Sequence, residues 1–262
     1  MLKQIMVDTH THTVLSGHAW STLRENAAAA AKRGMAGLCL TEHGHAMPGT
    51  GPFFLTTAQK MLPPEVERMR IYYGVEANIM DLKGGLDIED RMLFASEWNI
   101  ASMHDICVLP GTPEENTAAF KGALAHPAVD MLGHIDDGKT PNVIEEVVRE
   151  AGRLGKIIEI NNNSLLVRRG SRERVEEIAR LCKRHDVRVA VSSDAHFDTM
   201  IGAVEPALEL MAREDFPDEL VINRSREAFD AYQAERTRRL DSVRESFIGN
   251  KRSVRRMAQG GK

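Results

Sequence analysis

Residues 5–12 read Ile-Met-Val-Asp-Thr-His-Thr-His, a short β-rich run that leads directly into two histidines. The β-rich part covers residues 5–8, and six similar runs follow it, most of them beginning 25–35 residues after the previous one. Amphipathic helical segments lie between several of these runs. Strands that alternate with helices in this way predict an α/β fold with a parallel sheet. The six later runs cover residues 36–41, 71–75, 98–103, 130–133, 157–160 and 187–191.

Sequence signals for helix ends separate several of the runs. Thr22 and Thr112 are each followed three residues later by a glutamate, which is the pattern of a capping box. Thr140, which precedes a proline, predicts a third helix start. Apolar residues then recur at helical spacing on one face of each of two later helices, namely Val143, Val147, Ala151 and Leu154 in the first and Val175, Ile178, Ala179 and Cys182 in the second.

The number of strands favours a barrel. Seven strands within about 190 residues leave little room for a second domain, so we expect one domain over residues 1–235. A weak run at 220–222 is a candidate eighth strand. The alternative is an open doubly wound sheet, but no G-x-G-x-x-G or Walker loop follows any strand, so no nucleotide site is indicated.

The composition is that of a soluble globular protein. Of the 262 residues, 42% are apolar and 27% are charged, and the formal net charge is −4. This balance excludes a uniformly basic nucleic-acid-binding protein. No apolar run is long enough for a transmembrane helix or a signal peptide. Three widely spaced cysteines, Cys39, Cys107 and Cys182, fit neither a disulfide framework nor a zinc ribbon and predict reduced thiols in a cytoplasmic protein.

The C-terminal segment 236–262 differs from the rest of the chain. It carries nine Lys or Arg residues against two acidic ones, a net charge of +7 that leaves −11 on residues 1–235. We expect a basic tail that forms an exposed helix and is partly disordered. The alternative is an electrostatic arm for nucleic acid or another polyanion. The lack of aromatic residues other than Phe247 argues against that alternative.

Histidines and acidic residues follow the predicted strands. Active sites of parallel barrels form at the C-terminal ends of the strands, and six of the seven ends carry such a residue. His10 and His12 are two residues apart on an extended segment, so their rings face the same side, and Asp194 and His196 repeat this spacing. We therefore predict a metal site from nine residues: His10, His12, His18, His43, Glu76, His104, His134, Asp194 and His196.

The types of ligand constrain the metal and the substrate. Seven histidines and two carboxylates without a cysteine suit Zn, Mn, Fe or Co. Nine ligands exceed what one ion can use beside a substrate, so two or three ions are implied. Several divalent cations would attract an anion, and phosphate esters are the obvious class.

Other residues near this rim are candidates for substrate contacts. Arg168 and Arg169 follow the Asn-rich loop after the sixth strand, where a guanidinium can bind a phosphate, and Asn162 lies in that loop. His45, on a glycine-containing loop, can protonate a leaving oxygen. The alternatives are solvated arginines and an exposed loop histidine.

The motifs V-D-T-H-T-H, T-E-H-G, G-V-E-A-N, S-M-H, E-I-N-N-N-S and S-S-D-A-H together resemble those of the polymerase and histidinol phosphatase (PHP) family. They are most similar to its stand-alone YcdX-like phosphatase branch, from about residue 5 to about residue 230. The resemblance implies a distorted (β/α)7 TIM-like barrel that holds three divalent metal ions, Zn, Mn or Fe. It implies a metal-dependent phosphatase for small phosphate monoesters, in which a metal-bound hydroxide attacks phosphorus.

The resemblance also implies how the ligands are shared. The first metal would be held by His10, His12, Glu76 and Asp194, the second by Glu76, His104 and His134, and the third by His18, His43 and His196. Glu76 would thus bridge two ions, and Glu76 and Asp194 count as catalytic residues. Family members often show H-P-G at the fifth strand, where this chain has His134, Ile135 and Asp136.

Two other functions remain open. An amidohydrolase-type deaminase or lactonase shares the H-x-H motif and the late aspartate, but the fourth strand here lacks the lysine that such enzymes often carboxylate. The second alternative function is that of a non-catalytic PHP-like binding module. The complete ligand set argues against this alternative. The expected partners are a small phosphorylated substrate and, as an option, further copies of the chain. We expect no membrane contact, and nucleic acid at most at the basic tail.

Overall fold

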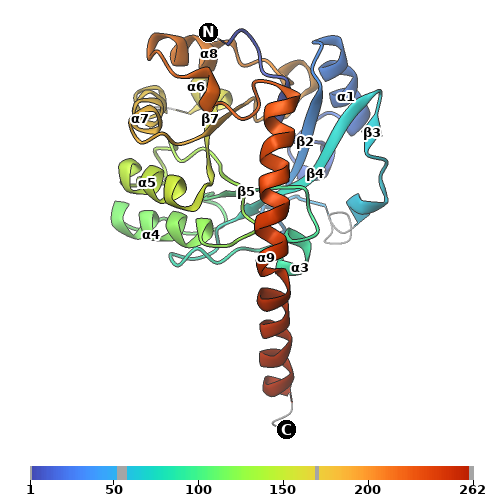
Figure 1. The fold of residues 1–262 in the computed structure, drawn as a ribbon, viewed down its shortest axis with the longest axis vertical. Coiled ribbons are helices and arrows are strands. Elements are labelled where there is room, and N and C mark those ends of the chain that lie inside the picture. The colour runs from blue at the N-terminus through green and yellow to red at the C-terminus, as the bar shows by residue number, and fades with distance from the viewer. Residues whose placement is uncertain (1, 52–57, 169–170, 260–262) are drawn as a thin grey trace.

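The computed structural model describes residues 2–51, 58–168 and 171–259, and beyond residue 243 it describes only the side chain of Phe247 (Figure 1). Seven parallel strands form one sheet in the order β1-β2-β4-β5-β6-β7-β8, and a short β3 (Glu65–Val66) pairs antiparallel with β4. All seven predicted strands are present. Their bounds are β1 Val7–Thr11, β2 Gly37–His43, β4 Met69–Asn78, β5 Trp98–Ser102, β6 Met131–Leu132, β7 Ile157–Asn161 and β8 Val189–Ser192.

The sheet curls until β8 meets β1. At the C-terminal end of the strands, the His12 amide donates to the Ala195 carbonyl at 2.9 Å. At the other end the segment 220–222 fills the gap, and the Ile222 amide donates to the Val189 carbonyl at 2.9 Å. That segment forms an isolated bridge and not an eighth strand. The predicted TIM-like barrel of seven parallel strands is confirmed, and it is nearly closed.

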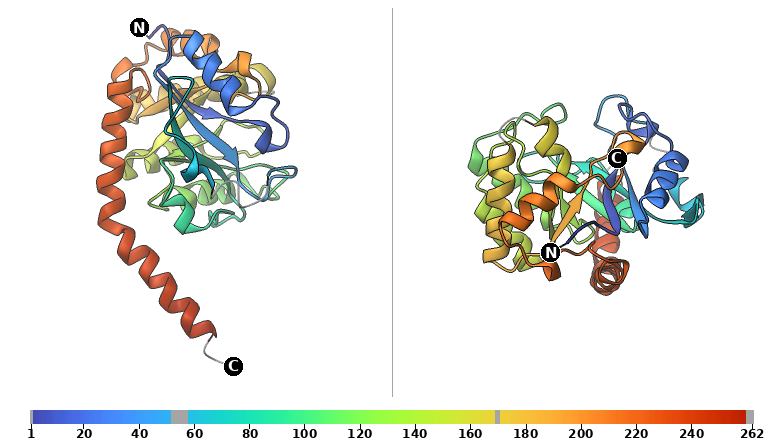
Figure 2. Two further views of the ribbon diagram at one scale, coloured as in Figure 1. Left: turned by 90° about the vertical axis from the view of Figure 1, so that its right-hand side faces the viewer. Right: turned by 90° about the horizontal axis from the view of Figure 1, so that it is seen from above.

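Helices pack on the outside of the sheet (Figures 1 and 2). The predicted capping boxes at Thr22 and Thr112 are both present. Among the described residues, no helix has both the length and the apolar composition needed to cross a bilayer. The helices are α1 Leu23–Lys32, α3 Asp90–Leu93, α4 Pro113–Leu124, α5 Ile144–Leu154, α6 Asn162–Val167, α7 Ser171–Arg184, α8 Glu205–Arg213 and α9 Arg226–Gln259, with 3-10 turns η1 Val14–Ser16, η2 Gln59–Met61, η3 Asp198–Met200 and η4 Asp218–Leu220.

The predicted start of α5 is wrong. The helix begins at Ile144, with Val143 as its N-cap, and not directly after Thr140. The Thr140 hydroxyl instead donates to the Asp137 carbonyl at 3.3 Å, so the Thr-Pro pair ends a turn of the preceding loop. Val147 and Ala151 of the predicted face are buried and Leu154 packs partly buried against the core, with Ile144 and Val148 buried beside them.

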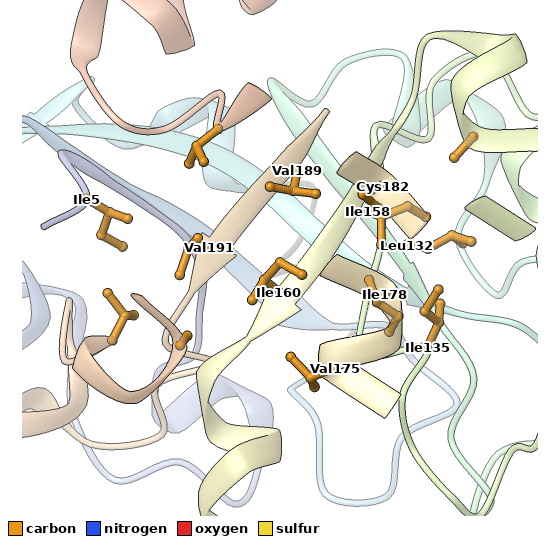
Figure 3. Packing of buried hydrophobic residues seen from close by; sticks show 14 of the residues in the cluster. Ile5, Leu132, Ile135, Ile158, Ile160, Val175, Ile178, Cys182, Val189 and Val191 are labelled. Atoms are coloured by element: carbon orange, nitrogen blue, oxygen red, sulfur yellow. The ribbon is translucent and has the colours of Figure 1, made fainter. Parts of the chain in front are cut away.

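The apolar layer between sheet and helices is well defined at β7, β8 and α7. Ile158, Ile160 and Val191 of the two strands belong to the same buried cluster as Val175 and Ile178 of α7 (Figure 3). The apolar face predicted for α7 is therefore confirmed. Burial of each such side chain stabilises the fold by about 1.5–3 kcal/mol, which fixes the strands that carry the site.

Helix α9 covers the N-terminal ends of the strands and then extends away from the body (Figures 1 and 2). Phe229 and Tyr232 of this helix pack against the fully buried Trp98, with ring centroids 5.3 and 5.7 Å away. The helix continues through residue 235, where we expected the domain to end. Arg236 and Leu240 beyond that point are only 5% and 6% exposed, so the expectation of an exposed tail does not hold for them.

A buried ion cluster docks α9 to the barrel. The Asp130 carboxylate is inaccessible to solvent and accepts from Arg236 Nε at 2.7 Å and Arg239 Nη2 at 2.8 Å. We predict that Asp130→Ala lowers the free energy of unfolding by about 3–5 kcal/mol, because Arg236 stays buried without its partner. Urea unfolding measures this loss.

The matched control is Arg24→Ala. It removes an ion pair of the same length, 2.7 Å to Glu67, whose side chains are 78% and 45% exposed. Exposed pairs contribute little, so we expect a change of at most about 1 kcal/mol. Equal losses in the two variants would contradict the importance of burial for the Asp130 cluster.

Candidate metal centre

The structure brings the nine predicted ligands together at the C-terminal ends of the strands. His10, His43 and Glu76 lie on strands, and the other six lie in the loops that follow strands or η1. Seven of the nine line a cavity of about 1090 Å³, and His10 and His12 are fully buried beneath it. The seven that line the cavity are His18, His43, Glu76, His104, His134, Asp194 and His196.

Glu76 lies at the centre of the cluster. Its carboxylate is fully buried, and its two oxygens face different rings. Three ring nitrogens surround Oε2, at 3.3 Å (His10 Nε2), 3.5 Å (His12 Nε2) and 2.6 Å (His43 Nδ1). Two more surround Oε1, at 3.0 Å (His134 Nε2) and 3.4 Å (His104 Nε2). A carboxylate between two sets of imidazoles has the arrangement needed to bridge two metal ions.

The first set is completed by Asp194. Its Oδ1 lies 3.4 Å from His12 Nε2 and 3.7 Å from His10 Nε2. Bonds of about 2.0–2.2 Å to one tetrahedral ion place neighbouring ligand atoms about 3.4 Å apart. The distances among these four side chains therefore fit a divalent ion. His10, His12 and Glu76 also form one of the groups whose donor atoms all lie within 4.8 Å of one another.

A third group of rings lies towards solvent. The Nε2 atoms of His18 and His196 are only 2.9 Å apart, and the His196 Nδ1 atom lies 3.0 Å from the Asp194 backbone carbonyl. The carbonyl can only accept, so His196 carries its proton on Nδ1 and its Nε2 lone pair faces His18. The His43 ring stacks on His18 at 4.9 Å. Such close nitrogens suit a shared cation.

The pKa shifts of two rings and of the central carboxylate favour metal binding. Burial lowers the pKa of His104 to about 4, and burial together with His43 and His196 lowers the pKa of His12 well below its usual range. Burial alone would raise the pKa of Glu76, but the rings of His10, His43 and His104 hold it well below its usual range. Neutral imidazoles and an ionised carboxylate are the forms that bind divalent metals. His10 differs, because burial would lower its pKa but Glu159, Glu76 and Asp194 raise it well above its usual range, so a metal ion at His10 must displace a proton.

Two of the ligands have unusual backbone conformations. His134 and Asp194 have φ angles of 28° and 50°, in the left-handed region that few non-glycine residues adopt. Gly133 permits the turn before His134, because a Cβ there would lie 2.2 Å from Ser102 Oγ. Strain of this kind gathers at functional sites, where the surrounding structure holds a side chain in one required position.

The predicted substrate contacts are only partly brought to the cavity. Arg168 lines it and is held by Ser164 Oγ at 2.8 Å and Asp194 Oδ2 at 3.4 Å. The Asn162 amide instead ties α6 to α8, donating to the Ala203 carbonyl at 2.9 Å and accepting from the Ala207 amide at 3.1 Å. His45 is half-buried and is not among the cavity-lining residues, and Arg169 lies outside the described residues.

A family model for the PHP domain matches residues 8–194, which is more than half of the chain. This chain belongs to the PHP domain family. The matched range contains eight of the nine candidate ligands, and His196 lies two residues beyond it.

Curated relatives of this PHP protein cover nearly its whole length. A probable phosphatase of Acetivibrio thermocellus is 42% identical over 239 residues, which are 90% of this chain and 99% of the relative. A probable phosphatase of Caldanaerobacter subterraneus subsp. tengcongensis is 40% identical over 249 residues, covering 94% and 98% of the two chains.

A solved structure supports the same architecture. The histidinol phosphate phosphatase of Lactococcus lactis, determined with zinc, L-histidinol and phosphate, superposes with a TM-score of 0.59. It is 17% identical and covers 83% of this chain and 95% of its own. At this identity the likeness establishes the fold of the PHP protein.

Sequence reasoning missed the residues that support the rings of this PHP site. Glu159 on β7 is fully buried and lies 2.6 Å from His10 Nδ1. Asn78 Oδ1 lies 2.8 Å from His104 Nδ1, and the Asn78 amide group donates to Asp87 at 2.7 Å. An acceptor on Nδ1 places the proton there and leaves the Nε2 lone pair for a metal. The sequence does contain a signal for Glu159, because an acidic residue inside an apolar strand is unusual.

Proposed function

We propose that this PHP protein is a metal-dependent phosphatase that hydrolyses small phosphate monoesters. The observation that carries the proposal is the convergence of nine candidate ligand side chains, seven of which line one open cavity of about 1090 Å³, with Arg168 also lining it. The names of the curated relatives, probable phosphatases, support the reaction. The zinc and phosphate found with the Lactococcus lactis enzyme support the same class of site.

We propose three divalent ions, Zn, Mn or Fe, held by the nine ligands. The fit of the His10, His12, Glu76 and Asp194 distances to a single ion supports the first site. The rings on Glu76 Oε1 support the second, and the His18–His196 approach of 2.9 Å supports the third. When bound, such ions polarise phosphoryl oxygens and lower the pKa of water.

Arg168 is the proposed phosphate contact of the protein itself. Its side chain is 20% exposed, and its position is fixed by Ser164, Asp194 and Asp137, the last at 3.5 Å. A fixed guanidinium can form two parallel hydrogen bonds to a phosphoryl group. Arg168 therefore orients the phosphate towards the side of the cavity that carries Asp194.

The three cysteines are free thiols, which supports a reducing, cytoplasmic location.

The experiment compares hydrolysis of p-nitrophenyl phosphate with that of bis(p-nitrophenyl) phosphate by the full chain loaded with Zn, Mn or Fe. We expect the monoester to react faster, a chelator to abolish the reaction, and added metal to restore it. His10→Ala should abolish activity, and the control His185→Ala should retain it, because His185 pairs with Glu145 outside the cavity. Activity that persists in chelator-treated protein, or a faster diester reaction, would contradict the proposal.

A further inference from the structure

We infer that Glu42, acting through Ser16, is a positioning residue that fixes His12 in the one tautomer able to bind a divalent metal. The inference rests on the proposed function of the site as a metal centre and goes beyond it, since Glu42 is not one of the nine ligands. It assigns a role to a buried acidic residue that the proposed reaction does not use.

Glu42 is buried beside the site, but its carboxylate contacts hydroxyl groups. It is the sixth residue of β2 and is 5% exposed. Its Oε1 lies 2.5 Å from Thr13 Oγ1, and its Oε2 lies 2.5 Å from Ser16 Oγ and 3.2 Å from the Thr13 amide nitrogen. Ser16 Oγ in turn lies 3.0 Å from His12 Nδ1. A continuous chain of contacts thus runs from Glu42 through Ser16 to His12.

The direction of these hydrogen bonds follows from which groups can donate. The backbone amides of His43 and Leu15 point at Ser16 Oγ and Thr13 Oγ1, at 3.2 and 3.3 Å. An amide N–H can only donate, so both hydroxyl oxygens accept there and keep their protons for other partners. Each hydroxyl proton then goes to the Glu42 carboxylate, which accepts every bond that it makes.

The consequence for His12 is a fixed tautomer. Ser16 has one hydroxyl proton and donates it in a hydrogen bond to Glu42, so Ser16 Oγ can only accept a hydrogen bond from His12. The His12 proton therefore lies on Nδ1, and the Nε2 lone pair faces Glu76 Oε2 at 3.5 Å and Asp194 Oδ1 at 3.4 Å. A lone pair directed at two carboxylate oxygens is favourable only when a cation lies between them.

Glu42 is needed here because a hydroxyl group has no fixed direction. The supports of two other rings, Glu159 for His10 and Asn78 for His104, present acceptor oxygens directly to the ring. Ser16 is different, since without Glu42 its proton can turn to His12 Nδ1. The His12 proton would then move to Nε2, which is the atom required for the metal.

The test compares four variants of the full chain. Glu42→Ala and Ser16→Ala break the chain of contacts, and Thr13→Val removes the other hydroxyl donor to Glu42 while leaving the chain intact. Glu42→Gln serves as the conservative rescue, because its amide oxygen can still accept from Ser16 and from the Thr13 amide. Thermal unfolding of each variant checks that it is folded.

Two readouts are used, and neither depends on activity. Two-bond ¹H–¹⁵N NMR of ¹⁵N-histidine-labelled, metal-free protein identifies the protonated nitrogen of His12. Competition with a chromophoric chelator measures the affinity for Zn²⁺. In Glu42→Ala and Ser16→Ala we expect loss of the pure Nδ1–H form and about 10–100-fold weaker binding of one zinc ion, as found when supports of metal-bound histidines are removed. Thr13→Val and Glu42→Gln should resemble the wild type in both readouts.

The outcomes separate this inference from the proposed function. A wild-type protein that binds no zinc would overturn the metal centre itself. An unchanged His12 tautomer and an unchanged zinc affinity in Glu42→Ala would overturn only the role of Glu42. The role of Glu42 would also be overturned if Glu42→Gln weakened zinc binding as much as Glu42→Ala does. The zinc affinity would then depend on the negative charge of Glu42 and not on the hydrogen bond that it accepts.

Discussion

Replacing Glu76 with glutamine is expected to remove at least two metal ions per chain and to lower the hydrolysis of p-nitrophenyl phosphate by more than about 100-fold. Residues that only support a metal ligand already contribute about 10–100-fold, and a bridging ligand should contribute more. The physical reason is that the two oxygens of Glu76 face separate sets of rings, within 3.5 Å on Oε2 and within 3.4 Å on Oε1. Glutamine keeps the volume but offers a single acceptor oxygen.

Elemental analysis of zinc-loaded, dialysed protein measures the metal content, and steady-state kinetics measure the activity. The matched control is Glu145→Gln, which alters a surface carboxylate that also pairs with a histidine, His185, at 2.8 Å. That variant should keep its metals and its activity. A Glu76→Gln protein with the full complement of metal would contradict the bridging role.

The fold was largely predictable because each strand is marked by its own residues. The run at 157–160 and the strand Ile157–Asn161 nearly coincide, since consecutive buried β-branched residues are typical of parallel strands. The run at 5–8 gave a less accurate result, because β1 extends over Val7–Thr11. The residues that follow Asp8 are polar and end the apolar part of the run, but pairing of Thr11 with Leu40 of β2 carries the strand across them.

The basic tail shows where composition alone misleads. Arg236 and Arg239 belong to the most basic segment of the chain, which suggested a solvated helix. Both are bound to Asp130, which lies more than 100 residues earlier in the sequence. This buried carboxylate, together with the buried side chain of Leu240, holds this part of α9 on the barrel. No local pattern in the sequence carries that information.

The nine candidate ligands could be named from the sequence because the strand ends collect them at one rim, whatever the details of packing. Their supporting residues could not be assigned in the same way. Glu159 interrupts the apolar run Ile157–Ile160, which marks it as unusual, but its partner His10 is 149 positions away. Only the closed barrel places the two side chains together. Spacing in the sequence therefore predicts which candidate ligands converge better than it predicts the groups that contact them.

Glu159→Gln should weaken metal binding by about 10–100-fold and also destabilise the protein. Four groups surround the carboxylate: His10 Nδ1 at 2.6 Å and Ser192 Oγ at 2.5 Å on Oε1, and the His134 amide at 2.6 Å and Asn161 Nδ2 at 3.1 Å on Oε2. Burial opposes the charge, but His10 lowers the pKa of Glu159, so the side chain is an ionised acceptor.

The amide group of glutamine cannot satisfy all of these donors. If its NH₂ faces the His134 amide, two donors meet and a buried group is left unpaired, at a cost of about 1–3 kcal/mol. If its NH₂ faces His10, the ring proton must move to Nε2, the atom that lies 3.3 Å from Glu76 Oε2.

Zinc titration and urea unfolding measure the two effects. The control Ser192→Ala removes one donor and leaves the contact between Glu159 and His10, so its zinc affinity should stay close to that of the wild type. Equal zinc affinities in all three proteins would show that the orientation of His10 does not depend on Glu159.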